Sequence, residues 1–311
     1  MSQILVVGTM AFDEIITPFG ESGKILGGSA SYISLSARKI FNGDIGVVSV
    51  IGKDFPNEYL ELFEKNNIDT TGVEKMENEK SFYWKGKYHN DLNKRDTLAT
   101  EVNALAHFEP KVPEKYKKAD FLVLGNLHPK IQKSVIEQMD KRPAFIALDT
   151  MNYWMDTAWD DLMEVISMID ILIVNDEEAR QLTKEYSLVK AAKKIREMGP
   201  EYVIIKKGEH GALLFKNNKI FFAPALPLED VFDPTGAGDT FAGGFIGQLA
   251  KTGIIDFELM KNAVITGANL ASFTVEKFGT ERLINLQEEE IKERLKDFIH
   301  LTQFDIELLD K

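Results

Sequence analysis

The sequence of 311 residues contains no cysteine, which excludes disulfide bonds, thiolate metal ligands and a cysteine nucleophile. It also has no uninterrupted apolar run of about 18 residues, the length that a membrane-spanning helix needs. Its first residues, MSQILVVG, lack a basic region followed by an apolar segment of signal-peptide length. We therefore expect a cytoplasmic protein with no membrane partner.

Excess positive charge is absent as well. The chain has 37 basic and 49 acidic residues, and its net charge of −12 argues against a nucleic-acid partner. A hydrophobic fraction of 44% and a charged fraction of 28% are typical of a globular protein. There is no internal repeat, no low-complexity linker and no second segment with a core of its own. The sequence therefore predicts a single domain over residues 1–311.

Short apolar runs alternate with helical patterns along most of the chain. The expected strands are 4–7, 45–51, 121–124, 145–148, 171–174 and 202–205, and the expected helices are 59–65, 131–139, 162–168, 188–198, 260–273 and 287–301. This alternation predicts an α/β fold with a doubly wound, mainly parallel sheet flanked by helices. The carboxyl ends of parallel strands meet at one edge, so the polar residues that follow these strands should converge on one crevice.

The stretch 233–250, DPTGAGDTFAGGFIGQLA, is the most informative part of the sequence. Pro234 and Gly236 interrupt any preceding strand, and from Ala237 the apolar residues recur at helical spacing. A glycine-rich turn that opens a helix leaves backbone amides free at the positive end of the helix dipole, which forms an anion site. Asp239 would stand beside that site, placed to accept a proton from a hydroxyl that attacks a bound phosphorus. Taken alone, Gly-x-Gly-Asp is more often an ordinary turn with a capping aspartate.

The full string resembles the C-terminal signature of the PfkB (ribokinase-like) family of carbohydrate and nucleoside kinases, Asp-Pro-x-Gly-Ala-Gly-Asp-x-Phe. The resemblance implies that Asp239 is the catalytic base and that the amides of Gly236, Ala237 and Gly238 form the anion hole. Two competing phosphate motifs are missing. The chain has no P-loop, and Phe241 stands where the dinucleotide fingerprint requires its last glycine.

Four residues match the acceptor side of the family. Asp13 follows the first expected strand, Gly27 and Gly28 precede a helix rich in small residues, and Asp233 opens the main motif. The resemblance implies that all four bind the substrate, since adjacent glycines let backbone approach a sugar closely. Ser29 replaces the lysine of ribokinase itself, which disfavours ribose and is more typical of some nucleoside kinases. Taken alone, Asp13 could equally be a solvated loop residue, and the glycines an ordinary turn.

Other residues match the nucleotide side. By resemblance, Asn175, Lys207, Gly208 and Asn269 bind ATP, and Glu178 of the Asn-x-x-Glu motif helps to hold Mg²⁺, through water. Mg²⁺ keeps several waters and takes few protein carboxylates, which is consistent with a water-mediated role. Asn175 as a helix cap followed by acidic first-turn residues is an equal interpretation. Many relatives also use a monovalent cation such as K⁺.

Residues 79–107 mix aromatic and β-branched residues with polar ones, which predicts an antiparallel insertion. The resemblance implies that this insertion, with residues 12–19, forms a β lid over the substrate that often also joins two subunits into a homodimer. Trp84, Tyr88 and Arg95 are candidates for substrate contact, and the two aromatic residues are equally candidates for the core of the lid or a lid–lid interface.

Together these features predict an ATP-dependent kinase that transfers the γ-phosphoryl group to a hydroxyl, expected to be a CH₂OH group, of a sugar. A nucleoside is the alternative acceptor. A non-catalytic nucleotide-binding regulator is a third hypothesis, which the intact Asp239 disfavours because such a protein has no need of the base.

Overall fold

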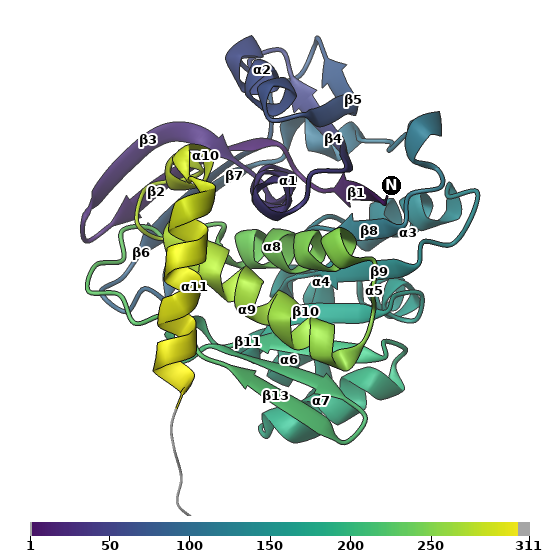
Figure 1. Cartoon of the computed structure of the whole chain (residues 1–311). Coiled ribbons are helices and arrows are strands. Elements are labelled where there is room, and N and C mark those ends of the chain that lie inside the picture. The colour runs from purple at the N-terminus through teal and green to yellow at the C-terminus, as the bar shows by residue number, and fades with distance from the viewer. Residues whose placement is uncertain (1, 304–311) are drawn as a thin grey trace, which may run out of the picture.

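The computed structural model describes residues 2–303. The strands of its large sheet are β1 (Gln3–Val7), β4 (Asp44–Gly52), β5 (Ile68–Met76), β8 (Phe121–Leu124), β9 (Phe145–Asp149), β10 (Ile171–Asn175), β11 (Tyr202–Lys206), β12 (Ala212–Lys216) and β13 (Lys219–Ala223). They lie in the order β13-β12-β11-β10-β9-β8-β1-β4-β5 (Figure 1). All pairs from β11 to β5 are parallel, and the β12–β13 hairpin continues the sheet antiparallel. The mainly parallel sheet predicted from the sequence is thus confirmed.

Helices cover both faces of the large sheet. One face, here called the α8 face, packs against α1 (Ser29–Ile40), α2 (Asn57–Lys65), α8 (Ala237–Thr252), α9 (Phe257–Thr274), α10 (Glu281–Asn285) and α11 (Glu288–Thr302). The other face, the α5 face, packs against α3 (Pro129–Glu137), α4 (Asn152–Thr157), α5 (Trp159–Ile166), α6 (Asp176–Thr183) and α7 (Leu188–Glu197). Within residues 2–303, no helix is long and apolar enough to cross a membrane.

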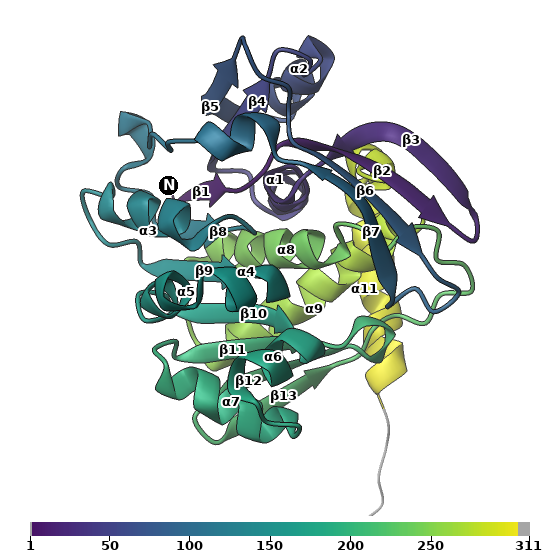
Figure 2. The ribbon, with the colours of Figure 1, turned by 180° about the vertical axis from the view of Figure 1, so that it is seen from behind.

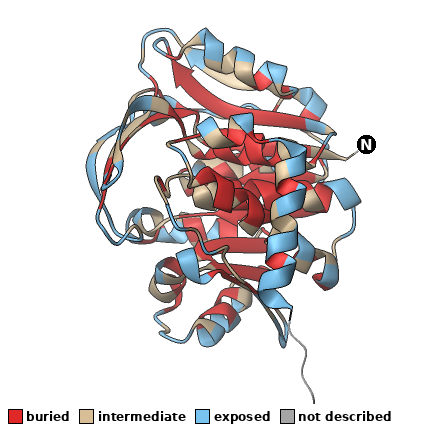
Figure 3. Ribbon diagram, turned by 60° about the vertical axis from the view of Figure 1, so that its left-hand side comes forward, coloured by how far each residue is buried: buried red, intermediate tan, exposed pale blue. Residues whose placement is uncertain are grey.

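The strands of the large sheet are buried on both faces. In β10, Ile171 and Ile173 join the core of the α8 face, whereas Leu172 and Val174 join the core of the α5 face. Consecutive side chains of a strand point to opposite faces, so Asn175 at the end of β10 lies on the α8 face. Burial on both sides also explains why these segments read as continuous apolar runs (Figure 3).

Four further strands form a small sheet in the order β3 (Gly20–Gly27), β2 (Ala11–Thr17), β6 (Tyr83–Tyr88) and β7 (Arg95–Glu101). Figure 2 shows this small sheet beside the carboxyl ends of β1 and β10. The sequence indicated β2, β6 and β7 but not β3, which extends the strand region to residue 27. Three glycines and three charged or polar residues among the eight of β3 hide its strand pattern.

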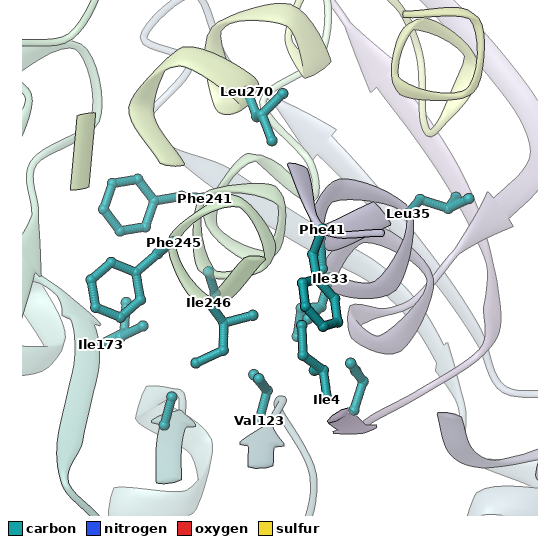
Figure 4. Packing of buried hydrophobic residues seen from close by; sticks show 14 of the residues in the cluster. Ile4, Ile33, Leu35, Phe41, Val123, Ile173, Phe241, Phe245, Ile246 and Leu270 are labelled. Atoms are coloured by element: carbon teal, nitrogen blue, oxygen red, sulfur yellow. The ribbon is translucent and has the colours of Figure 1, made fainter. Parts of the chain in front are cut away.

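Glycines let α8 approach both of its neighbouring helices closely (Figure 4). A Cβ atom added to Gly243 would lie 2.3 Å from the carbonyl oxygen of Ile33 in α1. On the other side, a Cβ atom on Gly267 of α9 would lie 2.6 Å from the carbonyl oxygen of Phe241. The glycines of α8 and α9 thus allow close packing on both sides of α8, and this packing fixes where α8 begins.

Gly243→Ala should destabilise the fold. Alanine favours a helix by about 1 kcal/mol over glycine, but its methyl group would push α8 away from the backbone of α1, and such overpacking costs about 1–3 kcal/mol. Urea unfolding measures the loss. Lys251→Ala, an exposed change on the same helix, should stay within about 0.5 kcal/mol of the wild type. An equally small loss in the free energy of unfolding for Gly243→Ala would show that a methyl group fits between α1 and α8.

Candidate active site

Asp239 lies in the first turn of α8. Gly236, the residue before the helix, has a left-handed backbone with φ of 73°, which favours glycine. A Cβ atom there would also lie 2.4 Å from the ring of Tyr32 in α1. The sequence therefore needs glycine at this position to start the helix, and the helix start puts Asp239 at the positive end of the α8 dipole.

The amides before and within this turn differ in their hydrogen bonding. The amide of Ala237 donates to the carbonyl oxygen of Pro234 at 3.2 Å. Within residues 2–303, the amides of Gly236, Gly238 and Asp239 have no hydrogen-bond acceptor. The turn thus offers the amides of Gly236 and Gly238, two of the three predicted for the anion hole, together with that of Asp239.

The carboxyl ends of β9 and β11 bring two polar side chains to the same place. In β9 and β11 the alternation that puts Ala147 and Ile204 into the core of the α8 face puts Asp149 and Lys206 on that face as well. The Lys206 ammonium donates to Asp149 Oδ2 at 2.8 Å. Lys206 Nζ also lies 2.8 Å from the position that a Cβ atom of Gly238 would take. The expected convergence of strand ends on one crevice is therefore present.

Glu178 completes this group from the first turn of α6. Its Oε2 accepts a hydrogen bond from the amide of Asn175 at 2.8 Å, and Asn175 Oδ1 accepts one from the amide of Glu178 at 2.8 Å. The two residues form a capping box, so the helix-cap interpretation of Asn175 is confirmed. We call Asp149, Glu178 and Asp239 the carboxylate cluster.

Burial perturbs the ionisation of the cluster. It raises the pKa of Asp239 to about 7, with Asp149 adding to the rise and Lys206 opposing it. Burial also raises the pKa of Glu178 to about 7, again with Asp149 adding to the rise and Lys206 opposing it. Burial on its own lowers the pKa of Lys206, but the charges of Asp149 and Glu178 outweigh it and raise that pKa overall. The ammonium is thus held in its charged form beside Glu178 and Asp239, whose pKa values are both raised.

Asp13 is buried in β2 beside the two adjacent glycines, so it is not a solvated loop residue. A Cβ atom on Gly27 would lie 1.9 Å from Asp13 Oδ2, and Gly28 has a φ of 91°. Both glycines are therefore required where they stand. Burial raises the pKa of Asp13 to about 7, with the charge of Asp233 acting in the same direction and the Gly28 amide and Arg95 opposing them.

Asp233 is fully buried and both of its carboxylate oxygens are engaged. Oδ1 accepts a hydrogen bond from the amide of Thr235 at 2.8 Å, and Oδ2 accepts one from the amide of Gly279 at 2.9 Å. Thr235 in turn donates from Oγ1 to the hydroxyl of Tyr88 in the small sheet at 3.0 Å. In this structure Asp233 shapes the loop before α8, so the substrate contact predicted for it would require these hydrogen bonds to break.

The remaining nucleotide-side predictions lie apart from the carboxylate cluster. Asn269 is fully buried, and its amide donates to the carbonyl oxygen of Ile291 at 3.0 Å, so a nucleotide contact would need the helices to separate. Lys207 Nζ lies 5.9 Å from the centre of the Phe222 ring, on the opposite side of β11 from Lys206. Gly208 is exposed with a φ of 54°, and a Cβ atom on it would meet Asn93 Oδ1 of the small sheet at 2.4 Å.

The small sheet contributes charge and aromatic surface to the same region. Arg95 is exposed at the start of β7, with its guanidinium carbon 5.7 Å from the centre of the Trp84 ring. Its charge lowers the pKa of Asp13 and of Asp239, which burial raises. Arg95 and the buried Tyr88 therefore face the site, and Trp84 lies on the same face of the small sheet as Asp13, with which it pairs across β2 and β6.

Lys206 and Tyr32 are site residues that the sequence interpretation missed. The signal for Lys206 was available, because counting in steps of two from Tyr202 puts it on the face that α8 covers. Tyr32 had no such signal. It is 1% exposed, its hydroxyl has no hydrogen-bond partner within residues 2–303, and it lies among Asp13, Asp233 and Asp239.

The signature, the fold and this geometry agree with one family description, "pfkB family carbohydrate kinase", which matches residues 4–286. The chain belongs to this family. It is therefore a phosphotransferase that acts on a hydroxyl acceptor, as the sequence predicted.

Individual relatives agree in fold and differ in substrate. A cytidine kinase from Thermococcus kodakarensis is 29% identical over 254 residues, covering 81% of this chain and 90% of that protein. A ribokinase from Lactococcus lactis is 22% identical over 303 residues, covering 90% of this chain and 93% of that protein. The crystal structure of a nucleoside kinase from Methanocaldococcus jannaschii superposes with a TM-score of 0.77 at 21% identity, covering 96% of this chain and 99% of that one. The last likeness confirms the ribokinase fold.

The buried carboxyl of Asp13 should make stability depend on pH. Its folded pKa of about 7 lies above the ordinary value of 3.8. Its stabilising contribution is therefore complete below pH 3.8 and is lost as the pH rises through 7, at up to about 1.4 kcal/mol per pH unit. Asp13→Asn removes this loss. The melting temperature of the variant, relative to the wild type, should rise between pH 4 and pH 7.

Asp160→Asn, in the exposed first turn of α5, reports the effect of removing one surface carboxylate. A difference in melting temperature between Asp13→Asn and the wild type that stays constant from pH 4 to pH 7 would contradict the raised pKa of Asp13.

Proposed function

We propose that this chain transfers the γ-phosphoryl group of ATP to a hydroxyl on the ribose of a nucleoside, with a free sugar as the second candidate acceptor. One observation carries the proposal: a carboxyl with a pKa of about 7 stands in the first turn of α8, beside amides that have no other acceptor. That arrangement brings together a base and an anion site, which are the two groups that phosphoryl transfer to a hydroxyl needs.

The proposed chemistry assigns a separate task to each group. The acceptor oxygen attacks the γ-phosphorus, the bond from that phosphorus to the bridging oxygen of ADP breaks, and the hydroxyl proton passes to Asp239. The amides of Gly236, Gly238 and Asp239 receive the charge on the transferring group. Asp13, whose carboxylate lies directly against the backbone of Gly27, holds another hydroxyl of the acceptor.

The residues also fit a magnesium ion held through water. Within residues 2–303 there is no group of three or more ligating side chains suited to a metal ion, so the protein alone does not enclose one. Glu178 is buried with Asp149 nearby, and Mg²⁺ commonly keeps several waters with one or two carboxylates and the phosphates of its nucleotide. When bound, Mg²⁺ would neutralise phosphate charge. A need for K⁺ stays a prediction of the family resemblance.

A nucleoside ranks first for two reasons. The T. kodakarensis cytidine kinase and the M. jannaschii nucleoside kinase are both nucleoside kinases by name. In addition, Trp84 lies half-buried on the small sheet and offers a flat surface against which a base can stack. A free sugar is second because Asp13 and the two glycines recognise hydroxyls and do not require a base.

We also propose that the small sheet acts as the lid expected from the sequence. Tyr88 ties it to the loop before α8, and Asn93 reaches Gly208 on the other side of the site. A closed lid would exclude water, which otherwise competes with the acceptor hydroxyl for the phosphoryl group. A homodimer through this sheet and a cytoplasmic location remain predictions.

Asp239→Asn should lower kcat by about 10²–10⁴ while ATP binding is largely retained, because the amide cannot accept the proton. Steady-state ADP release and calorimetric titration with ATP measure the two quantities. Asp160→Asn, also an acid in the first turn of a helix but exposed on α5, should match the wild type. Turnover by Asp239→Asn at the wild-type rate would remove Asp239 from the role of base.

The acceptor is identified by ADP release with Mg-ATP and a panel of cytidine, adenosine, inosine, ribose and fructose. We expect kcat/KM for at least one nucleoside to exceed that for either sugar by tenfold or more. A preference for a sugar would move recognition to Asp13 and the two glycines and would make the second candidate correct. Absence of turnover with every compound, with ATP still bound, would favour a non-catalytic protein.

A further inference from the structure

The hydrogen bonding of the Lys206 side chain is incomplete in a way that points to an anion. An ammonium group has three donors. Within residues 2–303, its only hydrogen-bond acceptor is Asp149 Oδ2 at 2.8 Å. The side chain is 19% exposed, so little water reaches it. Leaving charged donors unpaired in such a place is costly, which suggests that a ligand completes the set.

The position of Gly238 gives a second, independent observation. Its backbone does not have a positive φ, so its conformation does not require glycine. A Cβ atom at this position would lie 2.8 Å from Lys206 Nζ, so the lysine head lies directly against the backbone of Gly238. The amide of Gly238 has no acceptor within residues 2–303. The lysine head and this amide therefore lie side by side at the start of α8, where the helix dipole already favours an anion.

We propose that Lys206 is a catalytic residue that binds the phosphoryl group during its transfer. Its ammonium keeps the hydrogen bond to Asp149 and donates its other protons to oxygens of the γ-phosphoryl group. Lysine meets phosphate as a compact point charge, which suits a group whose oxygens move during the reaction. This inference rests on the proposed kinase function and adds a residue to it.

The step leaves Lys206 unchanged. The acceptor oxygen forms a bond to the γ-phosphorus, the bond from the phosphorus to ADP breaks, and the proton of the acceptor goes to Asp239. Lys206 remains protonated throughout and offsets the charge on the oxygens of the transferring group. Asp149 holds the ammonium in place, and is therefore a positioning residue.

A simpler role for Lys206 would be to neutralise Asp149 without touching the phosphoryl group. The two roles differ in what happens when Asp149 also loses its charge. A neutralising lysine is no longer needed once its ion-pair partner is an amide, whereas a lysine that binds phosphate is still needed. The double variant Lys206→Met/Asp149→Asn therefore separates them, and it also avoids the buried, unpaired carboxylate that could unfold Lys206→Met alone.

The experiment measures the melting temperature, the dissociation constant of ATP and kcat for this double variant beside the wild type. We expect a melting temperature close to that of the wild type, ATP binding weakened about tenfold, and kcat lowered about 10²–10³, the loss typical of removing one transition-state donor. Lys216→Met removes an ion-paired lysine from β12, remote from the carboxyl ends of the parallel strands, and should leave kcat unchanged.

A double variant with kcat within twofold of the wild type would overturn the assignment, because Lys206 would then only neutralise Asp149. A larger loss of kcat from Lys207→Met than from the double variant would also overturn it, in favour of the neighbouring lysine. If the wild type turns over no acceptor, the proposed function fails. The ATP titration still decides the inference in that case, since unchanged ATP affinity in the double variant would show that Lys206 contacts no phosphate.

Discussion

The approach of α8 to α1 and α9 is the contact on which the rest of the site depends. Gly243 and Gly267 let three helices lie closer than side chains would allow. That packing sets the height at which α8 begins over the sheet, and therefore where its free amides and Asp239 lie relative to the strand ends. The sheet supplies the opposing surface, because Asp149 and Lys206 are the last residues of β9 and β11 and lie on the α8 face. Site geometry thus follows from helix packing and strand alternation together.

Much of this arrangement could be predicted from the sequence, and for a physical reason. The strands β8 to β11 are buried on both faces, so their apolar runs stand out and their polar ends mark one edge. Lys206 was missed although alternation from Tyr202 identifies its face, since a lysine that follows a strand resembles a surface residue. Asn269 shows another limit: the resemblance assigned it to ATP, and its amide donates to a carbonyl oxygen of α11 that the spacing along α9 does not indicate. The face that a helical residue presents depends on packing, which spacing alone does not give.

Tyr32 and Asp233 show two features of a site that sequence spacing does not give: which distant residues join it, and which task each residue has. Tyr32 belongs to the site only because α1 passes beneath Gly236, a neighbour about 200 residues away that helix packing brings to it. Asp233 is the first residue of the most informative motif, yet its carboxylate already accepts hydrogen bonds from two backbone amides. A motif therefore identifies the chemistry of a region more reliably than the task of each of its members, and the division of tasks emerges from hydrogen-bond partners.

The bond between Asp233 and Gly279 also has a consequence for how the protein is made. Its two partners are 46 residues apart, and Gly279 comes after the whole of α9. Chains emerge from the ribosome from the N-terminus onward and begin to fold as they do so. The small sheet and most of the large sheet can form while the loop before α8 still lacks its anchor. The turn that holds Asp239 therefore reaches its final form only after Gly279 has been synthesised, later than the strands that supply Asp149 and Lys206.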